Sequence, residues 1–166
     1  MNKNLNKSVL LIAGEGGHLE QARRFNEMNQ KLVNGEFIVV TDEQEKNVKL
    51  SCEVIRMKNI SALTKQRTIR NMMAFMVLFT IEFVKTLYIL FKTRPCGVIA
   101  FGPIFCLPFI FWARVSGLKA VYIETWSKFY EPTITAKICN KLAHRIYIQN
   151  ITLKDKLVNG IYGGRL

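Results

Sequence analysis

The segment from residue 9 to residue 20, VLLIAGEGGHLE, places the strongest constraint on how this chain can fold. It opens with the apolar run Val9–Ala13, which is typical of a strand buried on both faces of a sheet. Glycines follow at positions 14, 16 and 17, and then Leu19, Ala22 and Phe25 recur with helical spacing. A strand, a glycine loop and a helix start predict an α/β fold whose helix N-terminus can bind an anion through its N–H groups and its dipole.

The glycine loop predicts a phosphate or diphosphate ligand, but it matches neither of two common nucleotide motifs. The dinucleotide pattern G-x-G-x-x-G would need glycine at position 19, where this chain has leucine, and no phosphate-loop ending Gly-Lys-Ser/Thr is present. A tight strand-to-helix turn without a ligand is therefore an alternative. His18 favours a functional site, because a histidine at the mouth of such a loop can act on a bound group as a general base.

Apolar segments and helical segments alternate along the rest of the chain. We expect strands at 36–41, 52–57, 97–101, 119–124 and 145–149, and helices at 71–91, 104–115 and 132–142. This alternation predicts a Rossmann-like α/β fold with a parallel, doubly wound sheet, and the 166 residues suit one domain. The final residues, 159–166, are too few and too rich in glycine for a helix.

Two residues that follow later strands are expected beside the glycine loop, because open parallel sheets bind ligands at the carboxyl ends of their strands. Gly102 follows the strand at 97–101, and Glu124 ends the strand at 119–124. A helix cap or a surface acid is the alternative for Glu124. Asp42, in the loop after the second strand, could bind a ribose, but the incomplete glycine pattern argues against this. His144 lies in an apolar setting and is expected to be structural.

The stretch 71–91, NMMAFMVLFTIEFVKTLYILF, is long and apolar enough to cross a bilayer as a helix. Glu82 and Lys85 argue against a simple span, although their spacing of three allows them to pair on one helix face. Basic residues flank the stretch at 67, 70, 92 and 94. We therefore expect a helix that lies on or dips into an anionic membrane surface, with a long core helix over the sheet as the alternative.

The net charge of +12, from 24 Lys and Arg against 12 Asp and Glu, indicates an anionic partner such as a membrane or a phosphorylated substrate. Nucleic acid is not expected, because the basic residues are dispersed and no nucleic-acid motif is present. The four cysteines, Cys52, Cys96, Cys106 and Cys139, lack metal-site spacing and fit a reducing compartment. No secretory signal precedes the first strand, and we expect neither a metal nor a cofactor.

Three stretches together resemble one family: GEGGH at 14–18, RPCGVIAFGPIFCLPFIFWARVSGLKAVYIET at 94–125, and the ending IYGGRL. They resemble PssD- and CpsF-type proteins of bacterial polysaccharide synthesis. These are similar to the membrane-anchoring subunit of the eukaryotic enzyme that adds the second N-acetylglucosamine to a dolichol-linked sugar. The resemblance implies the N-terminal, acceptor-binding half of a GT-B glycosyltransferase such as MurG, on a chain separate from the donor-binding half. A PssE-like partner would then bind the UDP-sugar.

The resemblance also implies roles for individual residues. Gly14, Gly16 and Gly17 match the family's glycine loop and would face the diphosphate of the acceptor. Gly102 is expected at the same acceptor site from its position after the strand at 97–101. His18 would be the general base, and Glu124 would orient the acceptor or assist the base. Glu15 departs from the family, which often has Ser or Thr there, and the tail at 159–166 would dock the partner.

The sequence therefore predicts an acceptor-binding, activating subunit of a two-chain inverting glycosyltransferase. It would transfer sugar to a polyprenyl-diphosphate-linked glycan in capsule or exopolysaccharide synthesis, at the cytoplasmic face of the plasma membrane. Two alternatives remain: a self-sufficient nucleotide-binding protein, and a purely structural membrane recruiter.

Overall fold

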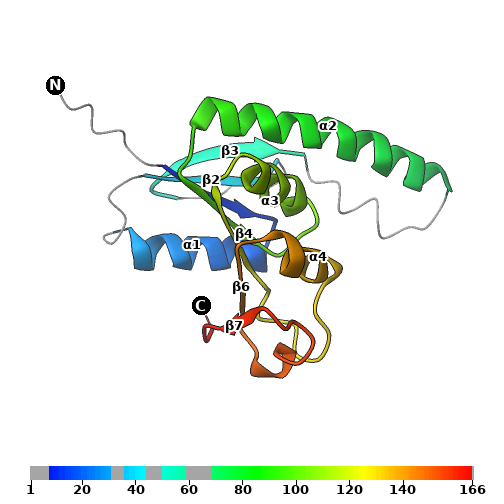
Figure 1. Ribbon diagram of the computed structural model, residues 1–166. Helices are drawn as coiled ribbons and strands as arrows, with labels where there is room; N and C mark the ends of the chain where they lie inside the picture. Colours follow the sequence, from blue (N-terminus) through cyan, green and yellow to red (C-terminus); the bar gives the residue numbers. More distant parts are fainter. Residues whose placement is uncertain (1–7, 31–35, 44–49, 59–68, 166) are drawn as a thin grey trace.

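The computed structural model describes residues 8–30, 36–43, 50–58 and 69–165 (Figure 1). In this part of the chain, parallel strands form a 7-stranded sheet in the order β3-β2-β1-β4-β5-β6-β7. The strands are β1 (Val9–Ala13), β2 (Phe37–Asp42), β3 (Glu53–Met57), β4 (Gly97–Phe101), β5 (Lys119–Ile123), β6 (Arg145–Ile148) and β7 (Gly160–Tyr162). The helices are α1 (Gly17–Asn29), α2 (Ile69–Thr93), α3 (Cys106–Val115) and α4 (Ile134–Leu142), with a short 3-10 turn at Ile151–Leu153. The expected parallel α/β sheet is confirmed.

The strand order reverses at β1, which lies between β2 and β4. Val9 is in register with Phe37 on one side and with Gly97 on the other. In an open parallel sheet this reversal leaves a crevice at the carboxyl ends of the two strands that flank it. The loops that follow β1 and β4 are therefore brought together at one edge of the sheet.

The apolar runs of the central strands are buried, as the sequence indicated. Leu10, Leu11, Ile12 and Ala13 have no exposed surface, and every residue of β2 is buried. Alternate side chains of β1 enter different cores, because successive residues of a strand point to opposite faces. One core contains residues of α2, α3 and α4, and the other contains residues of α1.

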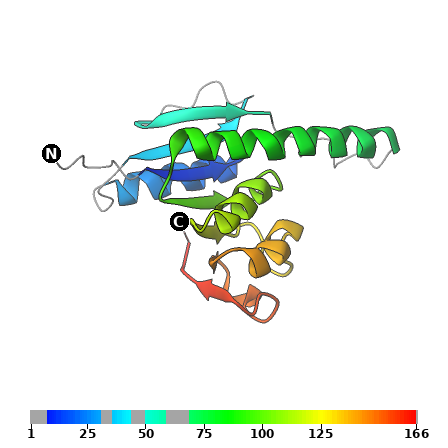
Figure 2. The same ribbon diagram turned by 45° about the horizontal axis from the view of Figure 1, so that its top comes forward.

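The two faces of the sheet are covered unequally (Figures 1 and 2). Of the described helices, α2, α3 and α4 pack on one face and only α1 packs on the other. On the α1 face, a mainly apolar cavity of about 360 Å³ lies over β4, β5 and β6. It is lined by residues that include Phe25, Ile99, Val121, Tyr147 and Gly164. Parallel sheets are ordinarily covered on both faces, so this half of the sheet is unusually open.

The ends of α3 and α4 follow from their sequences. Gly117 has a φ of 72°, and its N–H donates to the Arg114 carbonyl at 3.3 Å. The next N–H, of Leu118, donates to the Ala113 carbonyl at 2.8 Å, which completes a Schellman motif. At the start of α4, the Thr133 hydroxyl accepts from the Ala136 N–H at 3.0 Å.

The structure differs from the sequence interpretation in three places. Asp42 is the buried last residue of β2 and is not in a loop, because β2 pairs with β3 as far as Met57. Helix α3 begins at Cys106 and not at 104, after a turn at the end of β4. Residues 160–162 form an edge strand on β6, which the glycine-rich tail did not indicate. Position 67, one of the basic residues that flank the apolar stretch, lies outside the described residues.

Candidate functional site

The loop between β1 and α1 presents the helix N-terminus at the carboxyl edge of the sheet. Gly16 is the N-cap residue, with a φ of 60° that few residues other than glycine adopt readily. The first helical hydrogen bond of α1 runs from the Glu20 N–H to the Gly16 carbonyl. The N–H groups of Gly17, His18 and Leu19 therefore belong to the first turn, where an α-helix provides no acceptors of its own. Glu15, Gly16 and Gly17 are exposed, whereas Gly14 is buried. The exposed first turn has the geometry of an anion site.

Close contact between backbone and side chains joins the loop after β1 to the loop after β4. A Cβ atom on Gly14 would lie 2.7 Å from Cγ of Pro103. A Cβ atom on Gly102 would lie 2.1 Å from both Nδ1 and Cε1 of His18, and Gly102 has a φ of 86°. Position 102 therefore requires glycine for two reasons, its backbone conformation and the space taken by the histidine ring. The sequence-predicted residues Gly14, His18 and Gly102 are brought together.

The imidazole of His18 is half-buried, and its buried Nδ1 atom has no hydrogen-bond partner among the residues that the structure describes. Burial lowers the pKa of His18 from 6.5, because the charged form loses its hydration. The ring is therefore neutral at physiological pH. A neutral imidazole in hydrogen-bond reach of a hydroxyl can accept its proton, so His18 has the protonation state that a general base needs.

Glu124 is fully buried just beyond β5, and its carboxylate is bonded to the loop between β5 and α4. Oε1 accepts from the Thr125 N–H at 2.9 Å. Oε2 accepts from the Thr133 hydroxyl at 2.8 Å and from the Thr133 N–H at 3.2 Å. Burial raises the pKa of Glu124, and the bonds from these two threonines oppose that rise. Glu124 is thus not a surface acid: it supports the residue that caps α4.

Tyr122 connects the Glu124 loop to the histidine. Its hydroxyl donates to the Gly102 carbonyl at 2.8 Å and lies 3.3 Å from the Thr133 hydroxyl. The Tyr122 pKa is raised well above its usual value, chiefly by burial, so the hydroxyl keeps its proton. A continuous set of contacts therefore runs from His18 through Gly102 and Tyr122 to Thr133 and Glu124.

A buried amide network extends the site to α1 and β6, and sequence reasoning missed it. The Gln149 amide nitrogen donates to Oε1 of Gln21 at 3.0 Å and to the Glu124 carbonyl at 2.9 Å. The Gln21 amide nitrogen donates to the Thr125 hydroxyl at 3.4 Å. A signal was available, because Gln149 follows an apolar strand and Gln21 lies three residues after His18 on the helix.

The loop after β5 is also tied to the C-terminal tail. The Asn150 amide nitrogen donates to the Trp126 carbonyl at 2.8 Å, and its Oδ1 accepts from Arg165 at 3.2 Å. The Arg165 guanidinium also lies 5.4 Å from the centre of the Phe129 ring. The expected docking tail is therefore anchored beside the candidate site.

Some expected or alternative site features lie elsewhere. Asp42 is 3% exposed within β2, which does not suit an acid that binds a ribose. His144 directly precedes β6, at the amino ends of the strands, and its Nδ1 accepts from the Ala120 N–H at 3.2 Å, a structural contact. Within the described residues, no three His, Cys, Asp or Glu side chains are grouped so as to hold a metal ion.

Helix α2 is the second feature with functional character. Its segment Met72–Thr93, with 22 residues, is long and apolar enough to cross a membrane. An 18-residue window of this segment has a mean hydropathy of 1.9, yet only 22% of that window is buried. Eight large apolar side chains are 43–70% exposed: Met72, Met73, Met76, Val77, Ile81, Val84, Tyr88 and Phe91. The helix extends beyond the sheet (Figure 2). The core-helix alternative predicts a mostly buried helix, and this one is mostly exposed.

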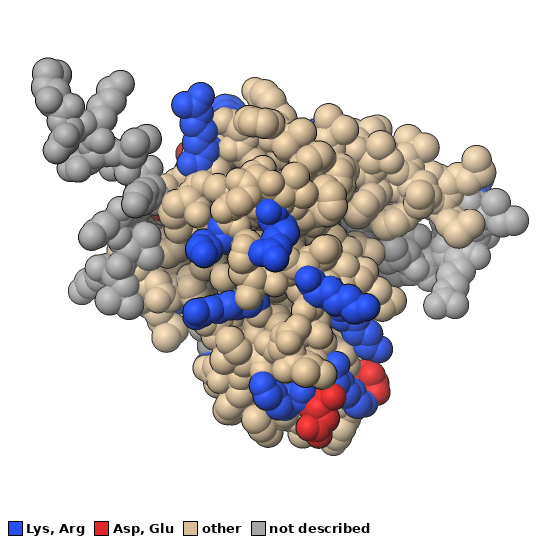
Figure 3. All heavy atoms as spheres, in the orientation of Figure 1, with Lys and Arg blue, Asp and Glu red and all other residues tan. Residues whose placement is uncertain are grey.

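Of the charged pair in α2, Glu82 faces the protein and Lys85 is exposed. Glu82 is 3% exposed, and its Oε1 lies 2.9 Å from Nζ of Lys85, so the expected pairing is confirmed. Directly after Glu82, the Phe83 carbonyl accepts a hydrogen bond of 2.9 Å from the Trp112 indole of α3. Lys and Arg side chains spread over the face shown in Figure 3, while the α2 region at its upper right is largely uncharged.

Comparison of the fold with solved structures gives the structural class to which the chain belongs. The chain superposes on Acinetobacter baumannii MurG with a TM-score of 0.66 and 13% identity, covering 88% of this chain and 42% of that one. It superposes on UDP-N-acetylglucosamine 2-epimerase from Rickettsia bellii with a TM-score of 0.68 and 13% identity, covering 96% of this chain and 45% of that one. The chain thus spans less than half the length of either structure, and its sheet is that of one half of a GT-B glycosyltransferase fold. Because a transferase and an epimerase share it, the fold alone does not define the reaction.

The sequence comparison is more specific. Residues 9–166 match the family model described as oligosaccharide biosynthesis protein Alg14 like, and the chain belongs to this family. It is 24% identical over 179 residues to the rat UDP-N-acetylglucosamine transferase subunit ALG14, covering 95% of this chain and 82% of the rat protein.

Proposed function

We propose that this chain is the acceptor-binding, membrane-docked subunit of a two-chain inverting glycosyltransferase of the PssD/CpsF type. Its partner, a PssE-like chain, would bind the UDP-sugar, and this chain would bind a polyprenyl-diphosphate-linked glycan at the cytoplasmic face of the plasma membrane. Capsule or exopolysaccharide synthesis is the pathway we infer. The observation that carries the proposal is the contact of His18 with Gly102 beside the exposed start of α1.

The start of α1 would hold the acceptor diphosphate. Gly16 and Gly17 are exposed there, and the helix dipole adds positive potential. A side chain at either position would stand between the backbone N–H groups and a phosphate, whereas glycine permits close approach. Glu15 is also exposed, so its carboxylate has room to turn toward solvent and away from the phosphates.

His18 would act as the general base of the transfer step. The acceptor hydroxyl oxygen attacks the anomeric carbon of the donor sugar from the face opposite the departing UDP. Its proton passes to the neutral imidazole, and the bond to UDP breaks as the new glycosidic bond forms. Burial of the imidazole supports this role, since the lowered pKa keeps the base unprotonated.

Glu124 fits a positioning role better than direct proton transfer. Its two carboxylate oxygens accept hydrogen bonds from Thr125 and Thr133, and Thr133 in turn contacts Tyr122. Through these contacts it fixes the loop that stands beside Gly102. Orienting the acceptor, as expected from the sequence, would follow from holding this loop in place.

The open half of the α1 face offers a surface for the partner chain. The cavity over β4–β6 is largely apolar, and Gly163 and Gly164 of the tail line it. In two-domain relatives of twice the length, additional chain is available to cover such a surface; in a two-chain enzyme the partner would do so. The edge strand β7 and the anchored Arg165 place the tail at the border of this surface.

Helix α2 would dock the complex on the membrane. Its exposed apolar side chains have no partner in the described chain, and its last turn carries Lys92, followed by Arg94. Apolar side chains flanked by cations favour insertion at an anionic lipid surface. The burial of Glu82 against the protein removes one obstacle to deep insertion, so both a span and a surface helix remain compatible with α2.

The proposal is tested by measuring transfer of labelled sugar from UDP-sugar to lipid-linked acceptor in membranes. Three preparations are compared: this chain, a PssE-like companion, and both together. We expect strong transfer only with both chains, and a loss of about a hundredfold or more for His18→Ala, since general bases contribute on this scale. His144→Ala is the matched control, because it removes the other histidine of the chain, which lies outside the site.

Other outcomes favour the alternatives. If both chains are needed but His18→Ala retains full transfer, the chain is a membrane recruiter and His18 is not the base. If this chain binds UDP-sugar and transfers it alone, the two-chain proposal is wrong and a self-sufficient enzyme is supported.

A further inference from the structure

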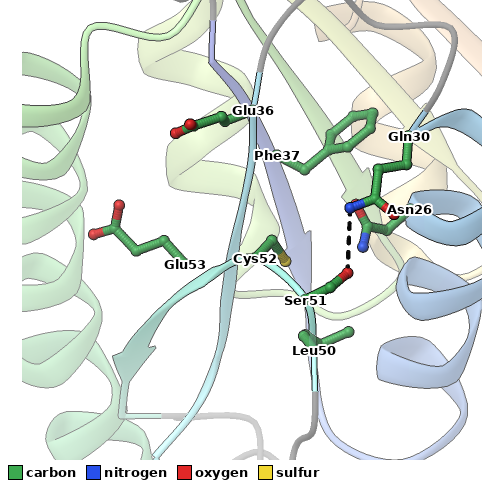
Figure 4. Close-up of a pocket in the computed structure, with 8 residues that line it drawn as sticks. All are labelled: Asn26, Gln30, Glu36, Phe37, Leu50, Ser51, Cys52 and Glu53. Atoms are coloured by element: carbon green, nitrogen blue, oxygen red, sulfur yellow. Dashed lines mark hydrogen bonds between the residues drawn. The ribbon is translucent and has the colours of Figure 1, made fainter.

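A polar cavity of about 490 Å³ lies between the end of α1 and the amino ends of β2 and β3 (Figure 4). Asn26 and Gln30 line it from the α1 side. The carboxylates of Glu36 and Glu53 point to the other face of the sheet, so one ligand cannot contact both pairs of side chains. The loop between β5 and α4 differs from this cavity, because its polar contacts converge on the start of α1.

Trp126, in the loop between β5 and α4, lies against the start of α1. A Cβ atom on Gly17 would lie 4.0 Å from Nε1 of the indole. The guanidinium of Arg24, about two turns further along α1, lies 5.2 Å from the centre of the indole ring. The indole therefore stands beside Gly17, the residue that precedes His18 in the candidate site.

The indole N–H of Trp126 donates to no atom among the residues that the structure describes. The other tryptophan of the chain, Trp112, does have an acceptor, the Phe83 carbonyl at 2.9 Å. An indole N–H can only donate, so it pairs with an oxygen where one is within reach. Because the Trp126 ring is half-buried and Nε1 keeps some exposed surface, an oxygen of a ligand can reach it.

Asn150 holds the loop that carries Trp126. It is 7% exposed, and its Nδ2 donates to the Trp126 carbonyl at 2.8 Å and to the Lys128 carbonyl at 2.5 Å. Its Oδ1 accepts from Arg165 of the tail at 3.2 Å, which fixes the orientation of the amide. Both polar atoms of this buried side chain thus have partners, and its two donor bonds fix the backbone on each side of residue 127.

We propose that Trp126 contacts the acceptor through its indole N–H, and that Asn150 is the positioning residue that keeps Trp126 beside Gly17. This inference rests on the proposed function, because it takes the lipid-linked diphosphate glycan as the ligand. Under that function the diphosphate would lie at Gly16 and Gly17 and the reacting hydroxyl at His18, so the indole borders the ligand. The oxygen that the indole contacts belongs either to the diphosphate or to the sugar attached to it.

Calorimetry on the purified full chain tests this contact with three probes. Farnesyl diphosphate carries the diphosphate alone, its N-acetylglucosamine conjugate adds a sugar, and farnesol carries neither and measures binding to the apolar side of α2. The dissociation constant of the conjugate should rise about fivefold in Trp126→Phe, which keeps an aromatic ring but removes the N–H. An equal rise for farnesyl diphosphate assigns the contacted oxygen to the diphosphate, and no rise for it assigns the oxygen to the sugar. Farnesol binding should not change.

Fluorescence tests the role of Asn150. In a Trp112→Phe chain, Trp126 is the one remaining tryptophan, because the sequence contains two. The conjugate should shift the emission of Trp126. Without ligand, Asn150→Ala should shift this emission to longer wavelengths, because the released indole becomes more exposed, and it should also raise the dissociation constant of the conjugate. Asn159→Ala is the matched control, because it removes a similar amide bond, to the Asn140 carbonyl at 3.0 Å, outside this loop.

Circular dichroism should show that each variant is folded. Arg165→Gln, at an exposed position, releases only Oδ1 of Asn150 and should give a smaller emission shift in the same direction. If Asn150→Ala and Arg165→Gln both leave the emission unchanged, Asn150 is not a positioning residue.

The contact itself is wrong if folded Trp126→Phe binds both diphosphate probes as tightly as the wild type does, and in that case the proposed function is unaffected. If neither diphosphate probe binds the wild-type chain more tightly than farnesol, then both this inference and the acceptor-binding function are wrong.

Discussion

The carboxyl edge of the sheet and helix α2 differ in the number of contacts that hold each in place. At the carboxyl edge, His18, Gly102, Tyr122 and Thr133 contact one another across segments far apart in the sequence. Helix α2 is fixed along one side only, by α3 and the sheet, and leaves an apolar side uncovered. The comparison teaches that a precise polar site needs many mutual contacts, whereas a membrane-docking surface needs apolar side chains that the protein itself does not cover.

The largest effect is expected from Gly102→Ala, which would break the contact at the carboxyl edge. The new Cβ atom would lie 2.1 Å from the His18 ring, in a residue with a φ of 86°. Overpacking and backbone strain together should lower the free energy of unfolding by about 2–4 kcal/mol. Urea unfolding of the purified chain measures this, and the transfer assay should show loss of activity.

Gly117→Ala is the matched control for that substitution. Gly117 also has a positive φ, of 72°, but no atom lies within 4 Å of its added Cβ. Only the backbone strain of about 1 kcal/mol should remain. Equal losses in the two variants would show that the His18 contact contributes nothing to stability.

An intermediate effect is expected from Val84→Asp on the uncovered side of α2. Val84 is 61% exposed, so the free energy of unfolding in solution should change by no more than about 0.5 kcal/mol. Membrane binding should fall sharply, because a carboxylate near the bilayer centre costs about 2.5–3.5 kcal/mol and less near the surface. Co-sedimentation with anionic vesicles measures the loss, whose size distinguishes deep insertion from surface docking.

Met28→Asp provides the comparison on α1. Met28 is 66% exposed, which matches Val84 in exposure but not in surroundings. It should leave vesicle binding unchanged. If both substitutions weaken binding equally, added negative charge alone explains the result and α2 is not the docking surface.

The smallest effect concerns pH and Glu124. Burial raises the pKa of Glu124 above 4.5 in the folded chain, so just above pH 4.5 the folded chain retains a proton that the unfolded chain has released. Stability should therefore fall as the pH rises through that window, up to the folded pKa. Thermal unfolding across this range should show the fall in the wild type and not in Glu124→Gln.

For Glu131 we expect stability to depend on pH in the opposite direction, so this residue serves as the control. Its pKa is lowered by the hydrogen bond from Lys156, so its stabilising effect should be lost as the pH falls below 4.5. If stability depends on pH above 4.5 in Glu124→Gln as it does in the wild type, then burial of the Glu124 carboxyl is not the cause of that dependence.

The comparison also explains what the sequence could predict. Strands such as Val9–Ala13 follow from local patterns of apolar residues, and this strand was predicted. The sequence did not predict that position 102 requires glycine. This requirement comes from the His18 ring, which lies near Gly102 only in the folded sheet. Strand β7 was missed because Ile161 and Tyr162 are half-exposed at a sheet edge and leave no apolar run.

The order of the strands has a consequence for how the chain is made. Strand β1 is synthesised early, but its neighbour β4 begins at Gly97, after the whole of α2 has left the ribosome. The centre of the sheet therefore cannot close until the long apolar helix α2 is already exposed, without α3 to cover any side of it. We expect a nascent chain of this kind to reach the membrane, or a chaperone, before its site exists, so that docking precedes completion of the fold.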